Sequence, residues 1–112
     1  MSEGVVVGVT NWMQMFRWIV KLIRDDFGID EKGLTRTAVL EEIGLAPEQL
    51  EQVLDFIREG FEVQFPEDTL DEAIHLEDLC MLVSWMKGFY KKPDFVTDEF
   101  EARCRSLNPI PA

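Results

Sequence analysis

The sequence has 112 residues, of which 46% are hydrophobic and 29% are charged, and its formal net charge is −11. This length and balance predict one globular domain with a core of its own, and they exclude a disordered chain. The acidic residues are unevenly placed, because thirteen of them lie between Glu41 and Asp78, where Arg58 is the only lysine or arginine. Such a field repels nucleic acid and anionic membranes and attracts basic protein surfaces. A solvated face that mainly aids solubility is the plainer interpretation.

Cysteine content and hydropathy indicate the compartment. Two cysteines, Cys80 and Cys104, are too few for a disulfide framework. Cys80 falls on an apolar helical stripe and is predicted to be a small core residue, whereas Cys104 is predicted to be a free thiol. The amino terminus has no basic segment followed by a long apolar run, and no window reaches the ~20 apolar residues of a membrane span. We therefore expect a cytoplasmic protein without a membrane span.

The first predicted helix covers residues 11–27. Residues 1–10 are valine-rich and broken by glycine, so we expect a flexible arm there. Thr10 or Asn11 can cap the helix, and Gly28 can end it. Its apolar residues recur at helical spacing and should face the core, while a basic strip remains outside. The stripe contains Trp12, Met15, Phe16, Ile19, Leu22, Ile23 and Phe27, and the strip contains Arg17, Lys21 and Arg24.

A long connection follows, from Gly28 to about Thr37. Its start resembles a calcium-binding loop, since Asp26, Gly28 and Asp30 have suitable spacing. However, Glu31 stands where such a loop needs glycine, and no glutamate occupies the twelfth position. The sequence therefore predicts no metal site in this connection.

The second helix is predicted over residues 47–59, with Pro47 in the first turn and Gly60 as its stop. Glu48 lies where the helix dipole favours negative charge. Apolar residues recur every three or four positions and form one buried stripe. The stripe contains Leu50, Val53, Leu54, Ile57 and Phe61, and the opposite face contains Glu48, Gln49, Glu51, Gln52, Asp55 and Glu59. This is an acidic amphipathic helix.

The rest of the chain contains two or three further helices. Residues 61–65 alternate like a strand, but Gly60 and Pro66 flank them, so we expect a loop that seals the core. A short third helix is predicted over residues 68–74 and a fourth over residues 76–88, with His75 as a cap or surface residue. After Pro93, a short helix over residues 98–106 can be capped by Thr97. Helices one and four carry more aromatic residues than one contact needs. The C-terminal residues Phe95, Val96 and Phe100 could fold back and cover this surface, or else the surface dimerises.

Residues 39–67 resemble the second-helix region of acyl carrier proteins. The matching segments are Val39-Leu40-Glu41-Glu42-Ile43-Gly44, Leu45-Ala46-Pro47, Phe61 and Phe65-Pro66-Glu67, and the resemblance covers about residues 12–88. It implies an all-α, acyl-carrier-like four-helix bundle over residues 11–92, with a mobile third helix beside an acyl chamber. It also implies a long first loop, which Leu34 and Leu40 would pin. Residues 93–112 would then be a short C-terminal extension.

One departure from the family pattern concerns its chemistry. The family's Asp-Ser dipeptide, whose serine accepts 4′-phosphopantetheine, falls on Ala46-Pro47, where there is no hydroxyl. No Ser or Thr occurs between Ala38 and Glu67, and Ser2, Ser84 and Ser106 do not stand at exposed helix starts. The chain is therefore expected to be a degenerate member with no cofactor. A true carrier modified at an unexpected serine is the alternative.

The resemblance also implies a partner. Carrier proteins place an acidic second helix on a basic patch of synthases and acyl transferases, and this chain keeps that face. We expect a non-catalytic module of lipid or fatty-acid metabolism that binds such enzymes or holds an acyl chain non-covalently. The expected contact residues are Glu48, Glu51, Gln52, Asp55, Glu59 and Glu62.

No catalytic set is recognisable in the sequence. His75 is the only histidine, there is no phosphate-binding glycine loop, and no paired Cys/His ligands occur. The carboxylates fall on polar helix faces rather than in a pocket that would shift their pKa values. We therefore expect no enzyme and no metal. A helical adaptor, or a homodimer through helices one and four, is the alternative from a different functional class.

Overall fold

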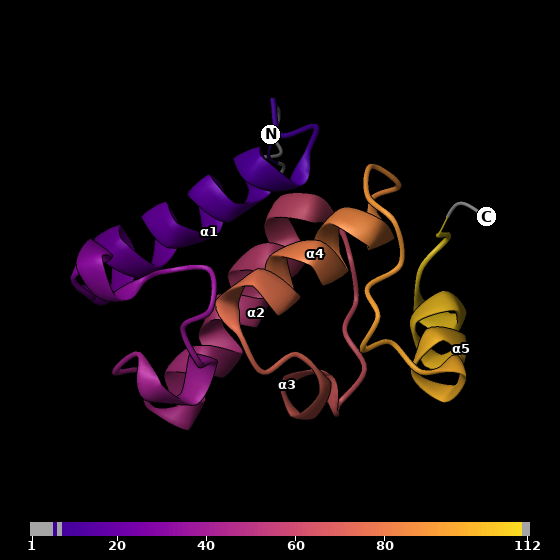
Figure 1. The fold of residues 1–112 in the computed structure, drawn as a ribbon. Helices are drawn as coiled ribbons and strands as arrows, with labels where there is room; N and C mark the ends of the chain where they lie inside the picture. Colours follow the sequence, from indigo (N-terminus) through magenta and orange to yellow (C-terminus); the bar gives the residue numbers. More distant parts are fainter. Residues whose placement is uncertain (1–5, 7, 111–112) are drawn as a thin grey trace.

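Helices form where the amphipathic patterns predicted them. The computed structural model describes residue 6 and residues 8–110, and within these residues the fold is all-α (Figure 1). The only β-type pairing there is one antiparallel bridge between Val39 and His75. The predicted all-α class is thus confirmed. The α-helices are α1 (Trp12–Phe27), α2 (Pro47–Phe61), α3 (Thr69–Glu72), α4 (Leu76–Met86) and α5 (Asp98–Leu107), and short 3-10 helices cover Glu31–Gly33 and Leu40–Glu42.

The first helix, α1, begins and ends at the predicted caps. The Asn11 side chain accepts a hydrogen bond from the Gln14 amide at 2.9 Å, and Gly28 has a left-handed backbone with φ of 73°. The apolar stripe of α1 packs mainly against α4 and also against α2. The residues of α1 that are buried are Met15, Ile19, Leu22 and Ile23.

The connection between α1 and α2 is tied to the start of α4. Leu34 and Leu40 are buried, as the resemblance implied. The Leu40 amide donates to the Ile74 carbonyl at 2.9 Å, and the Leu76 amide donates to the Ala38 carbonyl at 2.8 Å. These bonds hold the segment before α2 beside the segment between α3 and α4.

The second helix, α2, extends beyond its predicted end. Gly60 is helical and buried, and Glu62 takes the left-handed conformation instead, with φ of 56°. The prediction of Gly60 as the stop was wrong because tertiary contacts satisfy the end of the helix. The Lys87 ammonium donates to the Phe61 carbonyl at 2.8 Å, so a residue just beyond α4 completes the last turn of α2.

The fourth helix, α4, is the centre of the core. Its residues from Leu82 to Met86 are all buried. His75 is the residue before its first turn, and the Asp78 carboxylate accepts a hydrogen bond from the His75 amide at 3.0 Å. The loop after α2 seals the core as expected, because Phe61, Val63 and Phe65 are buried.

The C-terminal extension completes the core on one side of α4. Thr97 caps α5 by accepting a hydrogen bond from the Phe100 amide at 3.1 Å, and Phe100 is fully buried. The guanidinium of Arg105 lies over the Trp85 ring, 5.6 Å from its centroid. Asn108 is buried and makes two hydrogen bonds with the backbone of Gln64, at 2.7 and 2.8 Å.

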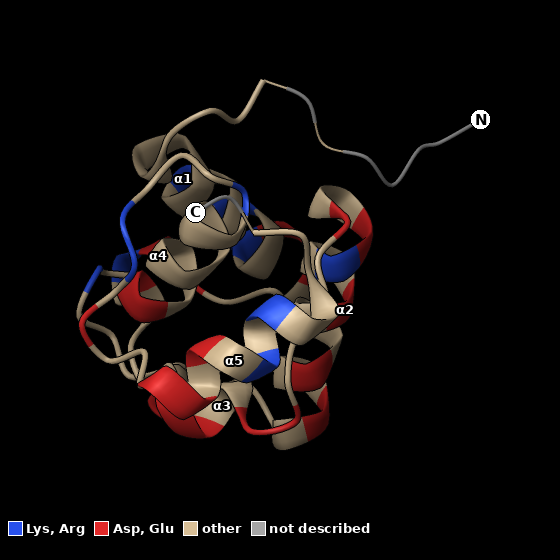
Figure 2. Cartoon of the chain, turned by 90° about the vertical axis from the view of Figure 1, so that its right-hand side faces the viewer, with Lys and Arg blue, Asp and Glu red and all other residues tan. Residues whose placement is uncertain are grey.

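The extension was expected to cover both α1 and α4, and that expectation holds only for α4. Figures 1 and 2 place α5 on the opposite side of α4 from α1. The aromatic residues of α1 are covered by other segments. Trp18 makes an edge contact with Phe61 at 4.9 Å between ring centroids, and Trp12 makes one with Tyr90 at 6.4 Å.

The predicted N-terminal arm falls largely on residues 1–5 and 7, which lie outside the described residues. Val6 donates its amide hydrogen to the Gly60 carbonyl at 2.6 Å, and Val9 is partly buried against the core. Cys80 and Cys104 are both free and buried. Within the described residues, no helix has the length and hydropathy needed to cross a bilayer.

Candidate functional site

The predicted contact residues lie along the solvent side of one helix. Glu48, Glu51, Gln52, Asp55 and Glu59 are all exposed on α2, and Glu62 is exposed directly after it. They share this side because the apolar stripe of α2 faces the core, so the polar positions between its members turn outward. Figure 2 shows acidic residues along α2 and on neighbouring α3. We call this surface the acidic face.

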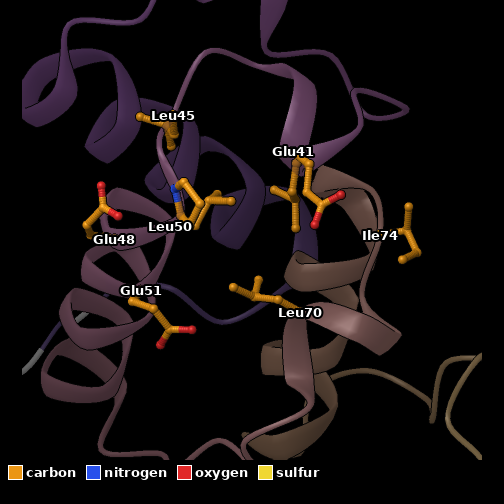
Figure 3. A pocket seen from close by; sticks show the side chains of 9 residues that line it. Glu41, Leu45, Glu48, Leu50, Glu51, Leu70 and Ile74 are labelled. Carbon is orange, nitrogen blue, oxygen red and sulfur yellow. The ribbon is translucent and has the colours of Figure 1, made fainter.

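A cavity of about 360 Å³ opens at the start of α2. Three parts of the chain surround it: the segment before α2, the first turns of α2, and α3 together with the two residues after it. Figure 3 shows its side chains around the opening, with Leu45 and Leu50 on the α2 side and Leu70 on the α3 side. The lining residues are Leu40, Glu41, Leu45, Pro47, Glu48, Leu50, Glu51, Leu70 and Ile74.

The apolar residues of the cavity differ in how far they are buried. Leu40, Leu45 and Leu50 are buried and form its floor, whereas Leu70 is half-buried and Ile74 is 43% exposed. An exposed isoleucine beside a hollow of this size provides apolar area that water contacts in this structure. Burial of that area by a ligand would therefore be favourable.

Three carboxylates surround this apolar floor. Glu41, Glu48 and Glu51 are exposed, and none of them forms an ion pair or hydrogen bond with another side chain in the part of the chain that the structure describes. Glu48 and Glu51 belong to both the acidic face and the cavity. The two features are therefore one continuous surface, with Pro47 at its edge.

The other end of the acidic face is partly neutralised. Arg58 forms an ion pair with Asp55 one turn away, and its guanidinium lies 5.7 Å from the centroid of the Phe65 ring. Asp55, Arg58, Glu59 and Glu62 line a shallow polar groove there. The predicted contact residues thus form two groups: unpaired acids near the cavity at the start of α2, and partly paired acids near its C-terminal end.

The serine positions bear on covalent attachment. Pro47 is the first residue of α2 and is exposed, so the residue at the expected attachment position is accessible but has no hydroxyl. Ser84 is completely buried in α4, and its hydroxyl donates to the Cys80 carbonyl at 2.7 Å. Ser106 is exposed in α5, where its hydroxyl donates to the Arg103 carbonyl. Ser2 lies outside the described residues.

His75, Cys80 and Cys104 do not line the cavity. The His75 imidazole lies 3.0 Å from Asp78, its partner at the start of α4. Burial raises the pKa of the Cys104 thiol to about 12 and also raises the pKa of the Cys80 thiol, so both thiols stay protonated near neutral pH. Among the described residues, no group of three His, Cys, Asp or Glu side chains is arranged to hold a metal ion.

No family model, curated protein or solved structure matches this chain. The resemblance to acyl carrier proteins therefore depends on the sequence segments quoted above.

Sequence reasoning did not identify Glu41, Leu70 and Ile74 as site residues. They come from segments on either side of α2, and backbone hydrogen bonds near Leu40 and Leu76 join those two segments. A weak signal was present. Leu70 and Ile74 are four residues apart around a helix too short to bury both, so one apolar residue had to remain exposed.

Proposed function

We propose that this protein is a non-catalytic interaction module with an acyl-carrier-like helical architecture and no covalent arm. Its acidic face would bind a basic patch on an acyl-transfer or synthase enzyme of the fatty-acid or polyketide type. The observation that carries this proposal is that all six predicted contact residues are exposed, five on α2 and Glu62 directly after it, in a helix that begins at an exposed Pro47.

The order of elements is consistent with this proposal. A long first helix, a long pinned connection, an acidic second helix, a short third helix and a buried fourth helix follow one another, as the resemblance implies. The cavity between α2 and α3 also lies where the resemblance places an acyl chamber. These agreements support a carrier-like architecture for residues 11–92.

The absence of a hydroxyl at Pro47 separates this proposal from a true carrier. A carrier needs a nucleophilic oxygen at an exposed helix start, and Pro47 occupies that position. The burial of Ser84 excludes it as a substitute, since a transferase cannot reach a side chain with no exposed area. The module would therefore act through docking rather than through a bound thiol.

Non-covalent acyl binding is a second candidate, because the cavity is apolar and of suitable size. The charges at its mouth favour docking instead. A fatty-acid carboxylate would have to approach Glu41, Glu48 and Glu51, and like charges at close range repel.

The proposed function can be tested by restoring the missing chemistry. The protein is incubated with coenzyme A and a broad-specificity phosphopantetheinyl transferase, and its mass is measured. The unaltered protein should keep its mass. The Ala46→Asp, Pro47→Ser double variant should gain one phosphopantetheine group, because the hydroxyl would stand at an exposed helix start that tolerates the exchange.

The matched control is Ala46→Asp with Pro47→Ala, which changes the same positions without adding a hydroxyl and should stay unmodified. Adding Glu48→Gln and Glu51→Gln to the double variant should slow its modification, since the transferase would lose part of the acidic face. Modification of the unaltered protein would contradict the absence of an arm. A folded double variant that is never modified would contradict the carrier-like surface.

A further inference from the structure

The cavity joins a hydrophobic floor to an unpaired acidic rim within a few residues. Leu40, Leu45 and Leu50 form the buried floor, and Leu70 and Ile74 extend it to the surface. A hollow of about 360 Å³ is at the lower end of the range for binding pockets. It suits one or two apolar side chains better than a large rigid ligand.

The rim restricts the charge of the ligand. Glu41, Glu48 and Glu51 come from two different segments, and no described side chain neutralises any of them. Figure 3 shows Glu48 and Glu51 together on the α2 side of the opening, with Glu41 across from them. A ligand that fills the floor therefore brings its outer part close to negative charge, which favours a cation.

The protein already contains a segment of this chemistry, at another place in its fold. On α5, Phe100 is fully buried, and Arg103 lies beside it on the same helix, with its guanidinium over the Phe100 ring at 5.6 Å and an ion pair to Asp68. Arg105 lies over the Trp85 ring of α4 and pairs with Glu101 of its own helix at 2.9 Å. On α5, a buried apolar side chain, Phe100, thus lies next to an arginine that pairs with an acid of a different segment, Asp68.

We propose that the cavity is the docking socket for a cationic amphipathic helix of a partner protein. The helix would insert an apolar side chain between Leu50, Leu70 and Ile74, and its Lys or Arg residues would pair with Glu41, Glu48 and Glu51. This inference rests on the proposed function, and it adds the chemistry of the partner and Glu41, which lies outside α2. The acidic face would then steer the partner, and the cavity would hold it.

The test uses a defined probe, a fluorescein-labelled helical peptide composed only of leucine and lysine. Binding to the full-length protein is followed by fluorescence anisotropy, and a peptide with serine in place of leucine serves as the charge-matched probe. The leucine-lysine peptide should bind at least tenfold more tightly than the serine-lysine peptide, because only the former has a side chain for the socket.

Two apolar variants test the floor. Leu70→Ser and the more exposed Ile74→Ser should each weaken binding of the leucine-lysine peptide several-fold. Leu107→Ser is the matched control, since Leu107 is similarly exposed, at 47%, but does not line the cavity. Ile74→Ser keeps the test valid if Leu70→Ser disturbs α3, because the Ile74 side chain is already half in water.

Two charge variants test the rim. The triple variant Glu41→Gln, Glu48→Gln, Glu51→Gln should weaken peptide binding roughly tenfold, since each rim charge contributes a modest amount. The control triple Glu67→Gln, Asp94→Asn, Glu99→Gln changes the net charge equally at exposed positions outside the cavity. It should weaken binding far less.

Three results would overturn the inference: equal binding of both peptides, no effect of Leu70→Ser and Ile74→Ser, or equal losses in the two charge triples. Tighter binding of dodecanoate than of dodecylammonium would also overturn it, because the cavity would then hold a lipid chain despite its rim. These readouts are independent of the transferase experiment. If binding depends on the rim charges but not on Leu70 and Ile74, this inference fails and the proposed function stands. If the Ala46→Asp, Pro47→Ser variant is never modified but the peptide binds as expected, the proposed function fails and the docking site stands.

Discussion

The C-terminal segment and the cavity beside Pro47 both combine apolar and acidic side chains, but the acids beside the apolar side chains are paired in the first and, among the described residues, unpaired in the second. At α5, apolar residues such as Phe100 are buried, and the neighbouring acids Glu101 and Asp68 pair with basic residues of the same segment. Apolar and acidic residues line the cavity together, but the described chain supplies neither a cover for the apolar residues nor a cation for the acids. At α5 the apolar residues are covered and the acids neutralised within the molecule, whereas at the cavity Ile74 is exposed and no described residue pairs with the acids. An open surface of this kind is a candidate for recognition.

The distribution of basic residues explains the difference. On α5, Arg103 pairs with Asp68 of a neighbouring segment, and Glu101 pairs with Arg105 of the same helix and with Lys92, so the acids at this surface have cationic partners. The region from Glu41 to Asp78 has only Arg58, which pairs with Asp55. The acids of the cavity cannot be neutralised from within this region.

Removing the C-terminal segment should give the largest effect. A chain truncated after Pro93 loses Val96, Phe100 and Asn108, all buried. Since one fully buried apolar side chain contributes about 1.5–3 kcal/mol, we expect the free energy of unfolding to fall by more than about 3 kcal/mol, or the protein to dimerise through the uncovered surface of α4. Urea unfolding and sedimentation measure the two outcomes.

The graded control for the truncation is Phe100→Ala, which should lower the free energy of unfolding by about 3–5 kcal/mol. It removes one fully buried ring while keeping the rest of the segment. Unchanged melting and sedimentation after truncation would show that α5 is an appendage and not part of the core, and the comparison of the two regions would then fail.

Removing the two hydrogen bonds between Asn108 and Gln64 should lower the free energy of unfolding by less than the truncation does. Asn108→Ala removes two hydrogen bonds between its buried side chain and the Gln64 backbone. We expect a loss of about 1–3 kcal/mol in the free energy of unfolding. Because the bonds hold the end of α5, the buried Cys104 thiol should react faster with a maleimide, while the Cys80 thiol in α4 should not.

The matched control is Ser106→Ala, which removes an exposed hydroxyl from the same helix. It should leave both labelling rates unchanged. Equal acceleration of Cys80 and Cys104 labelling in Asn108→Ala would mean that the whole protein opens at once, and that α5 is no separate unit.

The sequence predicted the helices well because their signals are local. The caps Asn11 and Gly28, the first-turn Pro47 and the apolar stripes of α1 and α2 each depend on residues within a few positions of one another. The end of α2 was missed for the opposite reason. A Lys87 side chain, distant in sequence, satisfies the Phe61 carbonyl, and no local pattern near Gly60 records that contact.

The candidate site was predictable only in part. The acidic face follows from the helical period of α2, so its exposure was foreseeable. The cavity requires Leu40, Leu70 and Ile74 to meet at the start of α2, and their positions depend on backbone bonds between segments more than thirty residues apart. The covering of α1 was also missed, because Trp18 is covered by Phe61 and not by the C-terminal segment.

Neutralising the cavity rim should change stability little. The triple variant Glu41→Gln, Glu48→Gln, Glu51→Gln removes repulsion between exposed carboxylates but also removes favourable charge at the start of α2. We expect the free energy of unfolding to change by about 0.5 kcal/mol or less. Urea unfolding at low and high salt measures it, and added salt should stabilise the wild type more than the variant, because salt screens the repulsion. A large loss would show that these acids are structural.

The smallest predicted effect is a pH dependence from the paired acid Glu101. Its contacts with Lys92 and then Arg105 lower the pKa of Glu101 in the folded protein. The unfolded chain therefore binds more protons at this residue, so its contribution to stability is present above the unfolded pKa, near 4.3 for glutamate, and is lost as the pH falls through the folded pKa. Glu101→Gln should thus be less stable than the wild type at pH 7, and the difference should shrink in acid.

Urea unfolding of both proteins at neutral and acidic pH measures this convergence. The Lys92→Met background provides the control, because it removes the contact with the largest effect on the Glu101 pKa and should reduce the pH dependence of the Glu101→Gln difference. A difference that stays constant with pH in both backgrounds would mean that Glu101 is as free as the carboxylates of the cavity. The paired acids at α5 and the unpaired acids at the cavity would then not differ electrostatically. The unpaired state of Glu41, Glu48 and Glu51 would no longer be an argument for a cationic partner.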